Sequence, residues 1–175
     1  MGIDDALDRA LEEERPGPSS ELVSVLAHDT LAHVKCHPPL ILDPETKLAE
    51  TLRQMKDHRR GCALLVKDQK LVGIFTERDV LMKVAGNRID VERTPVSAYM
   101  TRDPETLPVD AVVAFALNKM ILEGYRHIPF VDGIGRPVGV VSMRDIIEYL
   151  SEIYRHDVLN LPPDPNVTVK NRDGA

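Results

Sequence analysis

The chain has 175 residues, 43% hydrophobic and 29% charged, a composition typical of a soluble globular protein with one core or two small ones. Its net charge of −6 disfavours nucleic acid or an anionic membrane as main partner, and the absence of tryptophan disfavours a base-stacking surface. The first residues lack a signal-peptide pattern, no apolar run reaches bilayer length, and the two cysteines are expected to be reduced, so we predict a cytoplasmic protein.

Residues 1–21 are predicted to form an acidic N-terminal arm. Within the arm, residues 4–15 fit an amphipathic helix, which the proline- and glycine-rich run 16–20 would end. We favour a solvated arm over a helix that binds a partner.

Histidine and cysteine side chains gather before the first predicted strand, at His28, His33, Cys36 and His37. Zinc accepts such ligands. The spacing matches no standard metal signature, however, and His37 precedes a proline, which favours extended backbone. We therefore predict no metal site and keep a metal- or redox-responsive module as the less favoured alternative.

The first half of the chain predicts the order strand, helix, strand, strand, helix. Its members are a leading strand (39–42), a helix with one apolar face (Leu48, Leu52, Met55), a strand (62–66), a polar turn (67–70), a strand ending at the N-cap residue Thr76, and a closing helix (Val80, Leu81, Val84).

The same order recurs 65 to 66 residues later, which indicates a duplication. A linker (85–94) and a predicted short helix (95–101) introduce a leading strand (105–107), a helix (Val113, Leu117, Met120), a strand (127–131), a turn (132–136), a strand ending at Ser142, and a closing helix (Ile146, Ile147, Leu150). Neither half carries enough apolar surface for an independent core. We therefore expect an α+β fold in which two β-α-β-β-α repeats pack face to face about a pseudo-twofold axis.

One motif stands at the strand-to-helix junction of both halves. It reads Gly73-Ile-Phe-Thr76-Glu-Arg78-Asp79 and Gly139-Val-Val-Ser142-Met-Arg144-Asp145. A hydroxyl and an arginine beside free backbone N–H groups can bind phosphate, and a carboxylate can accept from sugar hydroxyls. A single copy would be explained equally well by helix capping. Two copies in register favour nucleotide binding, with which capping is compatible.

These residues closely resemble the cystathionine-beta-synthase (CBS) domain family, in which two copies form a Bateman module. The resemblance covers about residues 22–154 and includes the strand from Gly124 to Asp132. It divides the chain into the acidic arm (1–21), a first repeat with linker (22–93), a second repeat (94–155) and a flexible tail (156–175). It also implies a disk-like homodimer, which we expect to form through the apolar helix faces around Val80, Val84, Ile147 and Leu150.

The family resemblance implies adenosine ligands in clefts between the repeats. By this resemblance Asp79 and Asp145 would hold ribose hydroxyls, Thr76, Arg78, Ser142 and Arg144 would contact phosphate, and Arg126 and His127 would reach phosphate at their own or the neighbouring site. The adenine would lie among aliphatic residues, with Val72, Val138 and the leading strands as candidates. We predict a regulatory module that binds AMP, ADP, ATP or S-adenosylmethionine as ligand, requires no cofactor and signals to an effector protein.

The two copies differ at the start of the hairpin strand. Where the second copy has Arg126 and His127, the first has Gly61 and Cys62, and its nearest cations, Arg59 and Arg60, fall earlier. The capacity to bind phosphate is therefore skewed. We hypothesise that one cleft binds a charged nucleotide well and the other binds more weakly or not at all.

An enzyme is not predicted. Asp79 and Asp145 stand on separate repeats beside arginines that keep carboxylates ionised and weakly basic. No phosphate loop, metal–carboxylate cluster or nucleophile motif is present in the sequence. The alternative in another class is a constitutive scaffold whose clefts are vestigial.

Overall fold

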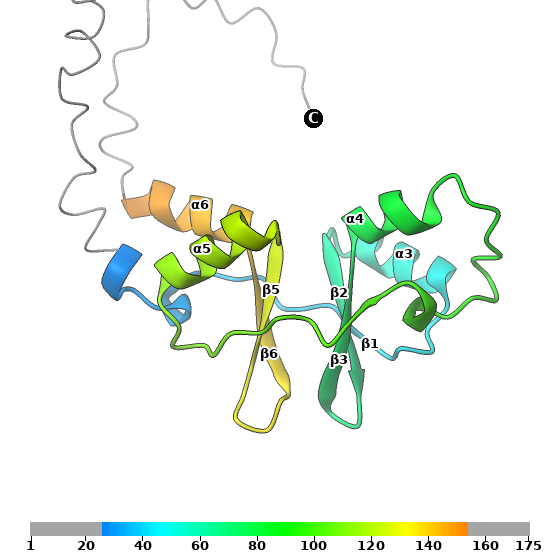
Figure 1. The fold of residues 1–175 in the computed structure, drawn as a ribbon, viewed down its shortest axis with the longest axis horizontal. Coiled ribbons are helices and arrows are strands. Elements are labelled where there is room, and N and C mark those ends of the chain that lie inside the picture. The colour runs from blue at the N-terminus through cyan, green and yellow to red at the C-terminus, as the bar shows by residue number, and fades with distance from the viewer. Residues whose placement is uncertain (1–25, 154–175) are drawn as a thin grey trace, which may run out of the picture.

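The computed structural model describes residues 26–153 (Figure 1). The predicted acidic arm (1–21) and C-terminal tail (156–175) lie outside these residues. The described chain holds two similar halves of mixed α and β structure, each with a hairpin and flanking helices. The predicted α+β class and the tandem repeat are confirmed.

The first repeat contains the predicted elements in the predicted order. They are β1 (Ile41–Leu42), α3 (Leu48–Asp57), β2 (Cys62–Lys67), β3 (Lys70–Thr76) and the helical turn α4 (Glu77–Asp79), which continues into the π-helical segment η2 (Val80–Val84). Strand β1 pairs parallel with β2, and β2 pairs antiparallel with β3.

The second repeat follows the same order with a reduced leading strand. Its elements are the 3-10 turn η3 (Val96–Ala98), β4 (Thr101–Arg102), α5 (Val113–Glu123), β5 (His127–Val131), β6 (Pro137–Ser142) and α6 (Met143–Ile153). In place of the predicted strand 105–107, Leu107 makes one parallel bridge to Phe130.

The predicted short helix over 95–101 is only partly right. The helical turn η3 covers three residues, and the chain then becomes extended in β4, which pairs antiparallel with β3 of the first repeat. The sheet of the first repeat therefore has the order β1-β2-β3-β4 and includes a strand from the second predicted domain.

The two hairpins face each other at the centre of the molecule, and the helices lie outside them (Figure 1). Between the hairpins lies a buried apolar cluster of Cys62, Leu64 and Ile74, against which Val140 of β6 packs. This contact produces the expected face-to-face packing about a pseudo-twofold axis.

Each repeat also has a core of its own, contrary to our expectation that neither would. The reason is an exchange of segments. Leu31 and Val34, at the start of the first repeat, are buried in the core of the second, while Val96 and Met100, at the start of the second repeat, are buried in the core of the first. Backbone hydrogen bonds fix both segments, among them Leu31 N to Ala111 O at 2.9 Å and Leu48 N to Thr94 O at 2.9 Å.

The motif glycines permit two close side-chain contacts. A Cβ atom at Gly73 would collide with the side chain of Met100, and one at Gly139 would collide with the ring of Phe130. Each motif therefore begins with glycine because a large side chain already fills that space.

The closing helices differ more than the sequence predicts. In the first repeat α4 and η2 together end at Val84, whereas α6 in the second is a regular helix of 11 residues. Of the residues around which we expect the contact face, Val84 is buried in the first core, Val80 and Leu150 are partly buried, and Ile147 is 56% exposed. Val84 is therefore not available for a contact, and the rest of the face stays a prediction. No helix within residues 26–153 is long and apolar enough to cross a bilayer.

The exchange of segments gives a stability prediction. Leu31 is buried in the second core. We expect Leu31→Ala to lower the free energy of unfolding by about 2–5 kcal/mol, because it removes a large buried side chain and leaves a cavity. Urea unfolding of residues 1–175 measures this. The control Ile134→Ala, at the exposed tip of the β5–β6 hairpin, should change stability by less than about 0.5 kcal/mol. Equal effects of the two variants would contradict a core role for the N-terminal segment.

Candidate functional site

The two motif junctions have the same local geometry. In the first, Oδ2 of Asp79 accepts hydrogen bonds from Thr76 N at 2.9 Å and Thr76 Oγ1 at 2.7 Å. In the second, Oδ2 of Asp145 accepts from Ser142 N and Ser142 Oγ, both at 2.7 Å. Each aspartate thus caps its helix with one oxygen. Capping leaves the other oxygen, Oδ1, available for a second contact.

The Oδ1 atoms of the two aspartates have different partners. Oδ1 of Asp79 lies 2.6 Å from Lys83 Nζ, which also donates to Tyr99 O at 3.0 Å. Oδ1 of Asp145 lies 3.5 Å from His37 Nδ1. Both carboxylates are buried. A sugar hydroxyl would therefore meet a lysine in one cleft and a histidine in the other.

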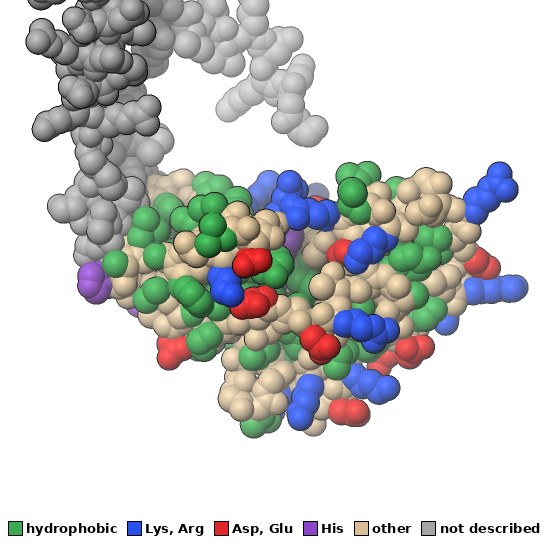
Figure 2. Space-filling view, viewed as in Figure 1, with side chains coloured by type: hydrophobic (Ala, Val, Ile, Leu, Met, Phe, Trp, Pro, Cys, Tyr) green, Lys and Arg blue, Asp and Glu red, His purple; other side chains and the backbone are tan. Residues whose placement is uncertain are grey.

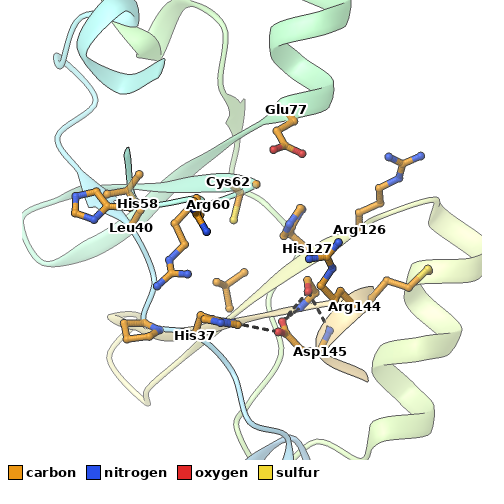
Figure 3. Close-up of a pocket in the computed structure, with 16 residues that line it drawn as sticks. His37, Leu40, His58, Arg60, Cys62, Glu77, Arg126, His127, Arg144 and Asp145 are labelled. Carbon is orange, nitrogen blue, oxygen red and sulfur yellow. Dashed lines mark hydrogen bonds and ion pairs between the residues drawn. The ribbon is translucent and has the colours of Figure 1, made fainter. Parts of the chain in front are cut away.

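The second motif opens into a cavity of about 600 Å³, which we call the Asp145 cleft (Figure 3). Side chains from both repeats line it: His37, Pro38, Leu40, His58, Arg59, Arg60, Cys62, Glu77, Arg126, His127, Val140, Ser142, Met143, Arg144 and Asp145. Arg60 extends toward His37, while the Arg126 guanidinium points away from Asp145 (Figure 3). The cleft combines an apolar wall with several cations, as a nucleotide site requires.

The first motif opens into a smaller cavity of about 380 Å³, which we call the Asp79 cleft. Its lining residues are Ile74, Thr76, Glu77, Arg78, Asp79, Thr101, Asp103, Pro104, Glu105, Glu123, Tyr125, Arg126 and His127. Arg78 donates from Nη1 to Gly124 O at 2.8 Å, which ties this motif to the second repeat. Residues from both repeats therefore line this cleft as well.

Glu77, Arg126 and His127 line both clefts and form a shared wall. A Cβ atom at Gly61 would stand only 2.9 Å from Nε2 of His127. A side chain at position 61 would therefore require the His127 ring to shift, and glycine leaves the ring in place.

Burial lowers the pKa of His127, although the nearby Glu77 carboxylate opposes this effect. The imidazole is therefore neutral at pH 7. In this state it can accept or donate one hydrogen bond in either cleft.

All eight predicted ligand-binding residues line one or both clefts. Thr76, Arg78 and Asp79 line the Asp79 cleft, Ser142, Arg144 and Asp145 line the Asp145 cleft, and Arg126 and His127 line both. Their role in binding stays a prediction. Of the adenine candidates, Val72 and Val138 line neither cleft, while Leu40 of the first leading segment lines the Asp145 cleft.

Sequence reasoning gave too little weight to Arg59 and Arg60. They precede the strand start in sequence, yet they line the Asp145 cleft, across the axis from their own motif. Arg59 has a φ of 51°, so the chain turns sharply where the helix ends. The expected pseudo-twofold axis could have predicted their position, since it places the start of each hairpin strand opposite the motif of the other repeat.

The histidines and cysteine before the first repeat do not gather into a metal site. His33 Nδ1 bonds Thr30 at 3.2 Å, His37 pairs with Asp145, and Cys36 packs against the second core. Within residues 26–153 no three histidine, cysteine or acidic side chains come together as metal ligands. Burial raises the pKa of Cys36 to about 11 and that of Cys62 to about 12, which makes both thiols poor nucleophiles at neutral pH.

The model of the CBS domain matches the chain twice, at residues 31–86 and 96–152. The chain belongs to the CBS domain family. Both matches begin at the exchanged segments, so each family unit includes the residues that complete the core of the other repeat.

Curated relatives share this CBS pair. An uncharacterized 17.7 kDa protein of Acidianus ambivalens is 36% identical over 115 residues, which span 65% of this chain and 68% of that protein. The Arabidopsis thaliana CBS domain-containing protein CBSCBSPB5 is 36% identical over 123 residues, which span 69% of this chain but only 22% of that protein.

Solved structures of CBS domains have the same fold. The CBS domain NE2398 is 28% identical with a TM-score of 0.64, and the match covers 69% of this chain and 95% of that one. The CBS domain protein PAE2072 of Pyrobaculum aerophilum, crystallised with AMP, is 27% identical with a TM-score of 0.62, covering 71% of this chain and 99% of that one. The predicted CBS pair is thereby confirmed.

The low pKa of His127 predicts a pH dependence of stability. The unfolded chain binds a proton at this imidazole near pH 6.5, before the folded protein does, so protons favour the unfolded state. The free energy of unfolding should fall as the pH drops below about 6.5. The free energy of unfolding of the His127→Asn variant should fall less steeply between pH 7 and 5.5, as measured by urea titrations at each pH. Parallel profiles for the two proteins would contradict the lowered pKa.

Proposed function

We propose that this CBS pair is a regulatory module that binds adenosine-containing nucleotides between its repeats and signals their presence to a partner protein. The observation that carries the proposal is the shared construction of the two clefts. Each places a motif aspartate and hydroxyl from one repeat in a cleft that at least one arginine of the other repeat also lines. The AMP complex of the Pyrobaculum aerophilum relative supports the same ligand class for this chain.

In this proposal each group keeps the role that its chemistry favours. Oδ1 of Asp79 or Asp145 accepts from ribose hydroxyls, while Oδ2 remains in the helix cap. Thr76 and Ser142, with the neighbouring arginines and the backbone N–H groups of the helix start, contact the 5′ substituent of the nucleoside, which is a phosphate in AMP. Leu40 and Val140 offer apolar contact to the base in the Asp145 cleft.

The proposed role is binding and not catalysis. The thiols of Cys36 and Cys62 have raised pKa values, and the motif aspartates are held in helix caps, so neither kind of group supplies an activated nucleophile or base. A ligand held by both repeats can change their relative position or rigidity only through different affinity for two states. A cytoplasmic effector would read that change.

We further propose that the module forms a homodimer through its exposed apolar helix surface. The large exposed hydrophobic side chains on the helices are Leu81, Met82, Phe115, Ile121, Leu122 and Ile147. Leu81 and Met82 belong to η2, and the others to α5 and α6, which pack against each other. Exposed apolar side chains on adjacent helices indicate a protein contact surface.

AMP binding should raise the melting temperature. A ligand at about 100 times its dissociation constant adds roughly 2.7 kcal/mol to the free energy of unfolding, or about 5–10 °C for a chain of this size. The double variant Asp79→Asn/Asp145→Asn should lose most of the shift, since the ribose acceptors lose their charge. Asp132→Asn, in the β5–β6 turn, is the matched control and should keep it. No shift with AMP, ADP, ATP or S-adenosylmethionine would contradict the proposal and favour a constitutive scaffold.

The dimer proposal predicts a mass of two chains in solution. Ile147→Asp should shift the protein to one chain, because it places a charge in an apolar contact. Ile134→Asp, at an equally exposed turn, should leave the mass unchanged. Light scattering after size exclusion measures both variants, and a single-chain mass for the unmodified protein would contradict a homodimer.

A further inference from the structure

The two clefts differ in charge although their motifs match. Among described residues that line the Asp145 cleft but not the Asp79 cleft, there are three arginines, Arg59, Arg60 and Arg144, and one carboxylate, Asp145. The imidazole rings of His37 and His58 also line this cleft and can donate hydrogen bonds to an anion. The cleft therefore carries an excess of positive charge.

The Asp79 cleft has the opposite balance. Among described residues that line it alone, Arg78 stands against Asp79, Asp103, Glu105 and Glu123. The face shown in Figure 2 has acidic and basic side chains side by side between the two halves, so the balance of the cleft follows from its lining residues.

Ion pairs reduce the negative charge of the Asp79 cleft without cancelling it. Lys83 neutralises Asp79, and Lys119 binds Glu105 Oε1 at 2.6 Å. Asp103 and Glu123 remain, and they outnumber Arg78, whose guanidinium is engaged with the Gly124 carbonyl. A phosphate group in this cleft would therefore face like charges at close range.

The shared wall does not alter this difference. Glu77, Arg126 and His127 contribute to both clefts, and the charges of Glu77 and Arg126 are opposite. The residues that belong to one cleft alone therefore decide which ligand charge it accepts. The larger cavity, about 600 Å³ against about 380 Å³, also belongs to the positive cleft.

We propose that the clefts take adenosine ligands of opposite charge. The Asp145 cleft binds the phosphorylated nucleotide, and the Asp79 cleft binds an adenosine derivative whose 5′ substituent carries a positive charge and no phosphate. The inference rests on the proposed function and assigns a ligand class to each of its sites. It requires that both ligands bind one chain at the same time.

The test uses AMP as the anionic probe and S-adenosylmethionine as the cationic probe, in calorimetric titrations of the full chain. Arg60→Gln should weaken AMP about fivefold and leave S-adenosylmethionine within about twofold. Glu123→Gln should do the reverse. The two variants are matched, since each removes one charge from the lining of one cleft. Circular dichroism and melting temperature check that both variants fold.

A competition experiment separates this inference from the proposed function. Saturating AMP should leave one S-adenosylmethionine bound per chain. Three results would overturn the charge assignment and leave nucleotide binding intact. The two probes could displace each other, Glu123→Gln could weaken the binding of AMP, or the protein could bind AMP but not S-adenosylmethionine. Failure of both probes to bind would overturn the inference together with the proposed function.

Discussion

The apolar contact between the two hairpins determines where every cleft residue lies. Cys62 and Leu64 of β2 and Ile74 of β3 pack against Val140 of β6 in the space between the sheets. Strands β3 and β6 end at the two motifs, while β2 and β5 begin opposite them. Once these faces are in contact, each motif is directed toward the strand start of the other repeat. The residues that line the clefts are thus brought together by the packing of the two repeats.

The same contact crowds the chain near the axis. A Cβ atom at Gly61 would lie 2.9 Å from Nε2 of His127, so a side chain there would require the ring to shift. The first repeat has glycine at this position, and its cations Arg59 and Arg60 line the Asp145 cleft. This close contact is a steric reason for the sequence difference. Its consequence is electrostatic, because these arginines enter the Asp145 cleft and not the Asp79 cleft.

Local sequence patterns were enough to predict most helices and strands, whereas their packing depends on long-range contacts that these patterns do not contain. The helix faces, the hairpins and the N-cap residues Thr76 and Ser142 were predictable because capping and periodicity act within a few residues. Strand β4, the burial of Val84 and the exchange of the segments around Leu31 and Val96 depend on residues far away in sequence. Six of the eight predicted site residues reach a cleft because they belong to the duplicated motif, whose local geometry is the same in both repeats. The other two, Arg126 and His127, line both clefts from the start of β5. Asp103 and Glu123 carry no such motif, so the charge of the Asp79 cleft emerges only from the fold.

The exchanged segments also connect the clefts to the cores. His37, which pairs with Asp145, follows Val34 in the segment that completes the second core. Likewise, Thr101 and Asp103, which line the Asp79 cleft, follow Met100 in the segment that completes the first core. A ligand that displaces His37 from Asp145 would therefore pull on a segment that crosses from one repeat to the other. The proteins that read such a module need not contact the ligand. They need only bind a surface whose position depends on these crossing segments, since a coupling free energy requires two states and not a direct contact.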